Sequence, residues 1–400
     1  MYKAFFIICL LLFVSFAQQT IAVEVKDLYL VKLEVKGQGK TERWKATLSG
    51  FREVLIRKSG SNSILQSYSV QQAYPKVTNY LQRFEYSSHK NEDNESVYLI
   101  SLYFEPRLIN NVIQQSQMPL WGSNRPVTLL WLAIEEDFER RIIHESQSSS
   151  PVEEQIDKDS IRRGVPIILP LMDLDDELKV SISDVWGRFA KPISEASLRY
   201  AADSVLFGRI QRQGERWNGK FGYLNQGTET AFELFEATQE LIISKMMDRI
   251  AELLCEKYCV VEEVGLKNEV MMDISDINSF TEFKQLESYL TSLSSISKIE
   301  LVTIAEDRTL FKLTLLGQLE SVIKGISLSQ KMLPIDPIQV ASNEENFEQV
   351  ISGSESLEAI LPKSSERLND SQNEDEKGDD EMSESENTNL LQTLYYRWVG

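Results

Sequence analysis

The sequence predicts a multi-domain protein that combines α+β and α/β units, and three observations lead to this prediction. The 400 residues are too many for one ordinary hydrophobic core. Strand-like runs alternate with helical patterns through the middle of the chain, which is typical of a mixed sheet covered by helices. Near the C-terminus the order strand, helix, strand, strand, helix, strand within about seventy residues indicates a ferredoxin-like unit.

The first 22 residues have the composition of a secretory signal peptide. Lys3 supplies a positive charge, residues 5–17 are apolar apart from Ser15, and Ala22 follows small residues suited to cleavage. We expect cleavage after Ala22. An uncleaved anchor helix is the alternative, which the short apolar core disfavours. No other stretch approaches ~18 apolar residues, so we expect no integral membrane segment in the mature chain.

Composition and motifs exclude several classes of partner. The formal net charge is −19, which argues against nucleic acid or an anionic lipid surface as a partner. Gly39-Lys40-Thr41 lies between a predicted strand and helix, as in a phosphate-binding loop. However, Glu34 stands where that motif requires glycine. We therefore predict no bound nucleotide, and we assign no other cofactor and no metal.

Residues 23–120 predict a small N-terminal α+β domain. We expect a strand over residues 25–35 and an amphipathic helix over residues 41–57, because Trp44, Leu48, Phe51 and Leu55 share one helical face. Two strands and a helix beginning at Pro106 complete this domain.

Residues 121–260 predict a mixed-sheet α/β middle domain. The Trp-Gly-Ser-Asn-Arg-Pro turn over residues 121–126 leads into an apolar run over residues 127–134. A run that is apolar on both faces predicts a central strand of a covered sheet. Residues 135–151 are polar, and we expect a mobile excursion there. Further strands are expected over residues 165–171, 204–210, 217–224 and 230–235, followed by a long helix.

The C-terminal third divides into three parts. Residues 261–337 carry the ferredoxin-like pattern. Residues 338–389 form an acidic linker that we expect to be disordered, since acids outnumber bases ten to two between Glu366 and Glu386. Residues 390–400 are apolar and aromatic, and include Trp398 as a candidate binding residue. We expect this segment to dock on its own domains, at a sheet edge. Strand addition to a partner protein is the alternative.

Cys255 and Cys259 lie four residues apart at the end of the long helix. An oxidising compartment permits a disulfide between them. Continuous helix gives side chains at this spacing a poor geometry for bonding, so a disulfide requires the helix to end between them. Two separate thiols are the alternative, and both possibilities stay open.

Two further groups are candidate binding residues. At the turn, Trp121, Asn124 and Arg125 are either partner contacts or structural residues at a joint, where Gly122 would adopt a positive φ. Beyond the second middle-domain strand, Asp173, Asp175 and Asp176 either bind an ion or line a ligand crevice, or form a solvated loop. We identify no catalytic residue, because we expect His89 and His144 to lie in polar, mobile loops without an orienting partner.

The helix end over residues 54–60, the turn over residues 121–126 and the strand over residues 131–134 together resemble an uncharacterised exported gammaproteobacterial family, the domain of unknown function twenty sixty-six. The likeness spans residues 24–260. It implies export into the periplasm of a Gram-negative bacterium and assigns no activity. Tyr396-Arg397-Trp398 resembles the usual ending of this family, which implies a structural place for the C-terminal segment.

We therefore predict an uncharacterised periplasmic protein of the cell envelope that binds or scaffolds a protein partner without catalysis. The alternative is an envelope hydrolase or ion-dependent enzyme that uses the acidic loop after residue 171.

Overall fold

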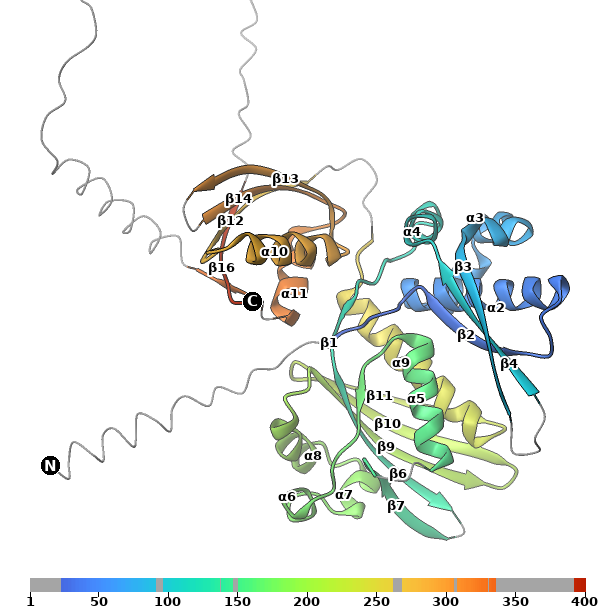
Figure 1. Cartoon of the computed structure of the whole chain (residues 1–400). Coiled ribbons are helices and arrows are strands. Elements are labelled where there is room, and N and C mark those ends of the chain that lie inside the picture. The colour runs from blue at the N-terminus through green and yellow to red at the C-terminus, as the bar shows by residue number, and fades with distance from the viewer. Residues whose placement is uncertain are drawn as a thin grey trace, which may run out of the picture.

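The computed structural model describes residues 23–90, 96–136, 138–146, 150–261, 268–305, 308–329, 331–335 and 392–400. The predicted signal peptide and acidic linker lie outside these residues. The chain is a mixed α/β protein with several sheets and separate hydrophobic cores, as the sequence predicts. Figure 1 shows an N-terminal unit in blue to teal, a middle unit in teal to yellow, and a C-terminal unit in orange and red.

The N-terminal unit is a three-stranded sheet with the order β2-β4-β3, and its helices pack on the core residues of β4. The predicted first helix is confirmed as α2. The predicted first strand is interrupted, because Asp27 adopts a left-handed conformation with φ 59°. The elements are β1 (Val23–Glu24), β2 (Leu30–Val35), α2 (Lys40–Ser59), η1 (Asn62–Gln66), α3 (Tyr68–Ala73), η2 (Tyr74–Tyr80), β3 (Leu81–Lys90), β4 (Ser96–Phe104) and α4 (Pro106–Gln115).

The middle unit is a mixed sheet with the order β11-β10-β9-β6-β7, and β8 also pairs with β6. The apolar run after the Trp121 turn forms β6, which is parallel to β8 and β9 and is buried on both faces. The elements are β5 (Asn124–Arg125), β6 (Thr128–Glu136), β7 (Glu139–Ile143), α5 (Pro151–Arg163), β8 (Ile167–Ile168), α6 (Leu174–Glu177), α7 (Ile182–Gly187), α8 (Ala190–Ser197), η3 (Leu198–Tyr200), β9 (Ser204–Gln213), β10 (Arg216–Asn225), β11 (Thr228–Glu236) and α9 (Gln239–Tyr258).

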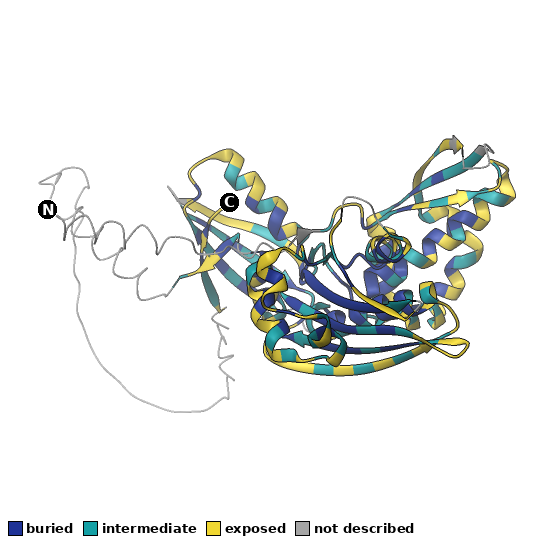
Figure 2. Cartoon of the chain, turned by 90° about the horizontal axis from the view of Figure 1, so that it is seen from below, coloured by how far each residue is buried: buried dark blue, intermediate teal, exposed yellow. Residues whose placement is uncertain are grey.

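Helices cover both faces of this sheet. α5 and α9 pack on one face, and α7 and α8 pack on the other. Figure 2 shows the resulting gradient, with buried central strands and an outermost strand, β11, whose residues are exposed or half-buried. Leu120 belongs to the core of the N-terminal unit and Trp121 to the core of the middle unit.

The structure corrects three predictions in the middle unit. The polar segment after β6 is not an excursion throughout, because β7 pairs with β6 and Arg140 forms a cross-strand ion pair with Glu135. The predicted strand over residues 165–171 is shortened to Ile167–Ile168. The acidic loop begins a short helix, since the Asp173 side chain caps the N-terminus of α6.

The C-terminal unit contains the predicted order of six elements, but its sheet has a fifth strand. The sheet order is β13-β14-β12-β16-β15. β16 is parallel to β12 and antiparallel to β15, and so separates two strands that are neighbours in a four-stranded ferredoxin-like sheet. The elements are β12 (Glu269–Ser275), α10 (Phe280–Ser292), β13 (Ile296–Ala305), β14 (Arg308–Leu315), α11 (Leu319–Ser329), β15 (Met332–Pro334) and β16 (Thr393–Trp398).

The C-terminal segment therefore docks on its own chain. The predicted position at a sheet edge is wrong, because β16 has a hydrogen-bonded neighbour on each side. Tyr396 and Trp398 project into the core of the C-terminal unit, which explains why the segment is aromatic. Among the described residues, no helix combines the length and the apolar character needed to cross a membrane.

Candidate functional site

The turn after the N-terminal unit buries Arg125 at the joint between that unit and the middle unit. Its guanidinium group lies 4.0 Å from the centre of the Trp121 ring and stacks on it. It also donates hydrogen bonds of 2.9–3.0 Å to the backbone carbonyls of Gly122, Arg57, Arg163 and Gly164. Arg125 thus connects α2, the turn and the end of α5. This geometry favours the structural interpretation of Trp121 and Arg125.

Two neighbours of Arg125 in the turn have local roles. Gly122 is not in the left-handed region, so the prediction of a positive φ is wrong. Its small size matters instead, because a Cβ atom there would lie 3.1 Å from the Ser294 hydroxyl oxygen of the C-terminal unit. Asn124 is half-buried and pairs with Glu24 between β5 and β1.

Other buried cations surround the same joint. The Lys58 ammonium group donates to the Trp121 carbonyl at 2.5 Å and lies 5.1 Å from the centre of the Tyr29 ring. Burial, with a smaller effect of the Arg125 charge, lowers the pKa of Lys58 well below its ordinary value. Burial likewise lowers the pKa of Arg163 to about 10. The joint therefore concentrates positive charge among backbone carbonyls.

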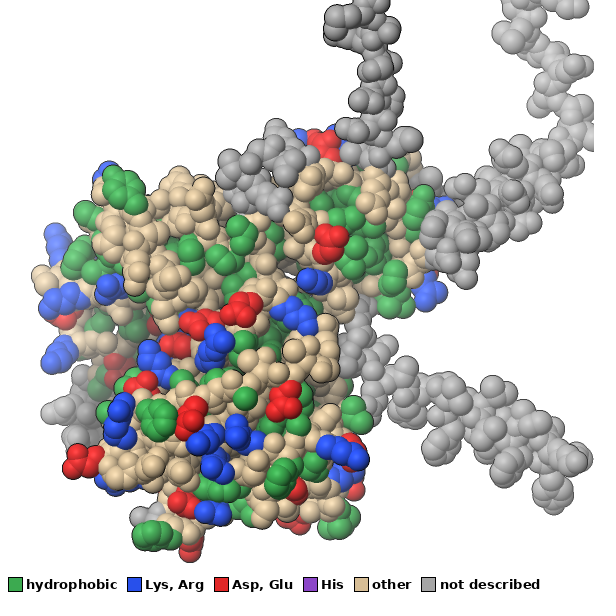
Figure 3. Space-filling view, turned by 180° about the vertical axis from the view of Figure 1, so that it is seen from behind, with side chains coloured by type: hydrophobic (Ala, Val, Ile, Leu, Met, Phe, Trp, Pro, Cys, Tyr) green, Lys and Arg blue, Asp and Glu red, His purple; other side chains and the backbone are tan. Residues whose placement is uncertain are grey.

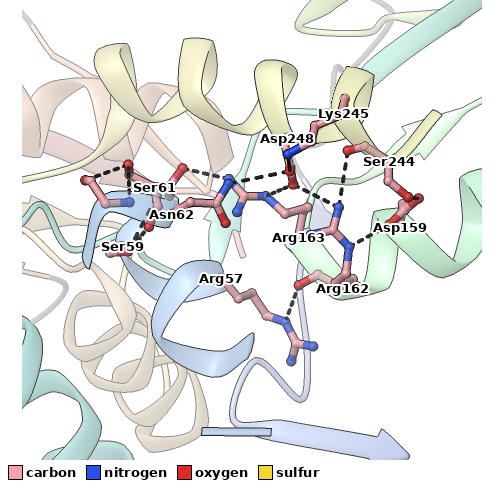
Figure 4. Close-up of polar contacts among 12 residues, drawn as sticks. Arg57, Ser59, Ser61, Asn62, Asp159, Arg162, Arg163, Ser244, Lys245 and Asp248 are labelled. Carbon is pink, nitrogen blue, oxygen red and sulfur yellow. Dashed lines mark hydrogen bonds and ion pairs between the residues drawn. The ribbon is translucent and has the colours of Figure 1, made fainter. Parts of the chain in front are cut away.

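An ionic network extends from this joint along α5 and α9 (Figure 4). Asp248 of α9 accepts a hydrogen bond from Arg162 Nη2 at 2.8 Å, and its carboxylate lies 3.5 Å from Arg163 Nε. Asn62 of the N-terminal unit donates to the same carboxylate at 3.5 Å. Arg162 Nε also donates to Asp159 at 2.6 Å. These contacts connect the N-terminal unit to both helices of the middle unit.

A groove of roughly 660 Å³ lies between β2 and α5, beside the joint. Its lining includes the apolar side chains of Leu28, Leu30 and Pro166. Ile161 of α5 also lines the groove and leaves 71% of its surface exposed. The volume lies within the range of ligand sites, so the groove is the candidate site of this protein.

The groove carries positive charge in an acidic protein. Lys26, Lys32 and Lys158 line it and are exposed, and none forms an ion pair with another described residue. At its base, Arg57 Nη2 lies 2.5 Å from the Glu53 carboxylate. Burial raises the pKa of Glu53 above its ordinary value, and the Arg57 charge offsets part of this rise. Asp27 is an exposed carboxylate in the same lining, and the three lysines outnumber it, so the rim keeps a net positive charge.

The acidic loop is a closed network of hydrogen bonds. Arg199 donates to Asp173 at 2.6 and 2.8 Å and to buried Asp176 at 3.2 Å. Asp176 also accepts from the Met172 amide and the Tyr200 hydroxyl. The Arg199 hydrogen bonds lower the pKa of Asp173 to about 2. Exposed Asp175 does not converge with these groups, and no set of three His, Cys, Asp or Glu side chains among the described residues could hold a metal ion.

The remaining candidate residues have structural positions. Trp398 is buried, with its ring centre 5.9 Å from that of Tyr289, so it is not an exposed contact residue. Cys255 and Cys259 form a disulfide with a Cα–Cα distance of 4.7 Å. As this bond requires, α9 ends at Tyr258, and Cys259 is extended with φ −80° and ψ 152°.

The sequence did not predict the groove. Leu30 and Ile161 lie far apart in the sequence and meet only because the joint brings β2 beside α5. One local signal was present. Val152 and Ile156 define the buried face of α5, and Ile161 is an apolar residue outside that face.

Comparisons with known proteins identify no activity. A family model described as Domain of unknown function (DUF8605) matches residues 22–122, which include the N-terminal unit and the start of the turn. This family differs from the one that the sequence resembles, and that resemblance stays a prediction. No protein of curated function has a matching sequence. A solved structure titled "Crystal structure of uncharacterized protein" is similar over 33% of this chain and 91% of its own, with 10% identity and a TM-score of 0.16. A score this low supports no inference.

Proposed function

We propose that this protein is an exported, periplasmic component of the cell envelope that binds or scaffolds a protein partner without catalysing a reaction. The observation that carries the proposal is the groove between β2 and α5, which combines apolar walls with a rim of three exposed lysines. Apolar contacts would supply affinity, and the lysine charges would steer an acidic partner toward the groove.

Three further features support this proposal. The Cys255–Cys259 disulfide fits the oxidising environment outside the cytoplasm. The Arg125 and Asp248 contacts hold the two walls of the groove, which reduces the entropic cost of binding. Lys, Arg, Asp and Glu side chains are interspersed on the face seen in Figure 3, where no broad patch of positive charge offers a nucleic-acid surface.

We also propose that the C-terminal unit is a ferredoxin-like domain whose sheet β16 has joined. The six-element order and the antiparallel direction of neighbouring β12 and β14 support this classification. The alternative function, a hydrolase or ion-dependent enzyme at the acidic loop, gains no support from carboxylates that Arg199 and Tyr200 already occupy.

A photocrosslinking amino acid at position 161 tests the proposed function. Position 198 provides a matched control, because Leu198 is 72% exposed and lies in η3, away from the groove. In cells that export the protein, we expect an adduct with a protein partner from position 161 and none from position 198. Lys32→Glu combined with Lys158→Glu should reduce the yield of this adduct. Equal yields from both positions, or none from position 161, would contradict a partner-binding groove.

A further inference from the structure

We propose that the groove binds an extended, acidic segment of its partner, and that this segment pairs as an additional strand with the outer edge of β2. This inference rests on the proposed function and specifies the binding mode and the chemistry of the partner. It draws on three observations, namely the unpaired edge of β2, the position of Arg57 and the lysines along the rim.

The backbone of β2 has one open side. Among the strands that the structure describes, β2 is an outer strand of its sheet and pairs only with β4. The Phe104 amide donates to the Tyr29 carbonyl, so the backbone groups of Tyr29 point toward β4. Backbone groups alternate in direction along a strand of an antiparallel pair. Those of Lys32 and Glu34 must therefore point away from β4.

Arg57 determines where pairing with a new strand can begin. Its Nη1 atom donates to the Leu28 carbonyl at 3.1 Å and to the Leu30 carbonyl at 2.8 Å, and so occupies the outer edge before Lys32. Among the described residues, none outside the sheet forms a hydrogen bond with the backbone of Lys32 or Glu34. An entering strand would therefore find its first free donor and acceptor at Lys32.

The surroundings of this edge define the partner. An added strand would lie between β2 and α5, where Ile161 and Pro166 offer apolar contacts to alternate side chains of the strand. Lys26, Lys32 and Lys158 would face the charged side chains of the strand. The matching ligand is an extended segment in which apolar residues alternate with Asp or Glu. A basic segment would be repelled.

A selection experiment tests this inference directly. A displayed library of random eight-residue peptides is selected on the chain comprising residues 23–400, and enriched peptides are synthesised with blocked ends. We expect alternating apolar and acidic residues in the enriched peptides. Backbone N-methylation of such a peptide at alternate residues, which removes donors for pairing, should weaken binding about tenfold or more.

The Lys32→Pro variant blocks the edge without removing a hydrogen bond to β4, because the amide of Lys32 points outward and proline is tolerated on an outer strand. We expect this variant to lose about tenfold or more in affinity for the selected peptides. Lys32→Ala, which retains the amide, is the matched control and should lose less. Urea unfolding of both variants checks that they fold. If Lys32→Pro does not fold, the binding of N-methylated and unmodified peptides to the wild type tests strand addition instead.

Hydrogen exchange gives an independent measure. The amides of Lys32 and Glu34 should gain protection when a selected peptide binds, whereas amides at the outer edge of β11 should not. Selected peptides that bind without this protection, and equally well to Lys32→Pro, would overturn strand addition but leave partner binding at the groove intact. A position-161 adduct without any enriched acidic peptide would overturn the ligand chemistry alone. A dimer of this chain that Lys32→Pro dissociates would assign the edge to a second copy, and so overturn the inference.

Discussion

Gly60 ends α2 in a left-handed conformation with φ 70°, and the disulfide packs against its α-carbon. A Cβ atom at this position would lie 2.4 Å from Cys255 Sγ, which is closer than any tolerated contact. Gly214 has nearly the same φ of 66°, but a Cβ atom there would have no heavy atom within 4 Å. Substitutions at these two glycines therefore distinguish the cost of backbone strain, which both share, from the cost of steric overlap, which arises only at Gly60.

This pair gives the first prediction. Gly214→Ala should lower the free energy of unfolding by about 1–2 kcal/mol, which is the cost of a left-handed non-glycine residue. Gly60→Ala should cost at least about 2 kcal/mol more, because the disulfide must shift. Urea unfolding of both variants measures the difference. Equal losses would show that the disulfide yields to the added methyl group without cost.

Lys58 gives a prediction about pH. Because burial lowers its pKa in the folded state, the unfolded state binds more protons between the folded pKa and the ordinary value of 10.5. The free energy of unfolding should therefore rise with pH as the solution approaches that value. Lys58→Met should remove the contribution of Lys58 to this rise while it retains the side-chain volume, whereas Arg163, whose pKa is lowered to about 10, contributes equally in both proteins.

Urea unfolding of the wild type and Lys58→Met between about pH 7 and 10 measures this contribution. The range stops there because the pKa of Tyr29 is raised to about 12 by burial, and its titration has the opposite effect on stability at higher pH. Parallel pH profiles for the two proteins would mean that Lys58 titrates alike in the folded and unfolded states.

At the scale of elements, the C-terminus of α9 depends on a covalent bond. Cys255 lies in the last turn of the helix and Cys259 is its C-cap, so the disulfide fixes the direction in which the chain leaves α9. The next residue, Val260, forms a β-bridge with Leu120 at the end of the N-terminal unit. The bond therefore helps to align two units.

We predict that Cys259→Ser lowers the free energy of unfolding by about 2 kcal/mol, the chain-entropy value for a short loop. Dithiothreitol should produce a similar loss in the wild type and no further loss in the variant. Urea unfolding with and without the reductant measures both effects. A variant as stable as the oxidised wild type would show that the helix end is held by packing alone.

The elements also show which parts of the fold a sequence reveals. β6 was predictable because every residue from Thr128 to Ile134 is buried, and α2 because its apolar residues repeat at helical spacing. β7 was not, because ion pairs such as Arg140–Glu135 stabilise its pairing with β6 in place of an alternating apolar pattern. The local pattern of apolar residues predicts which strands are buried, and it does not predict pairing between strands that carry charged residues.

The candidate site was harder to predict for a related reason. The sequence drew attention to the Trp121 turn and the acidic loop, where unusual residues cluster, and both have structural roles. The groove depends instead on the placement of β2 beside α5, which Arg57 and Arg125 fix through backbone carbonyls distant in sequence. No local spacing encodes such a contact. The disulfide was predicted as one of two possibilities, since it requires only that the helix end between Cys255 and Cys259, which is a local property of the sequence.

At the scale of the whole molecule, β16 completes the core of the C-terminal unit. We predict that Trp398→Ala destabilises this unit by about 3–5 kcal/mol, because a buried aromatic side chain is replaced by a cavity. Amide exchange should accelerate in β12 and β14, and the amides of β6 should be unchanged. Phe235→Ala, at a side chain with 49% exposure, is the control and should have little effect. Acceleration that extends to β6 would mean that the units unfold together.

The position of β16 also means that the sheet of the C-terminal unit could stay assembled if the polypeptide were cut between β15 and β16. β15 ends at Pro334 and β16 begins at Thr393, so one cut between residues 336 and 391 would divide the protein into two pieces without touching either strand. The shorter piece would still be held by its pairing with β12 and β15 and by the burial of Tyr396 and Trp398. A nicked preparation would then migrate as two bands in a denaturing gel and elute as one particle under native conditions. It would behave as a complex of two components, in which the C-terminal peptide stays bound without a covalent link to the rest of the protein.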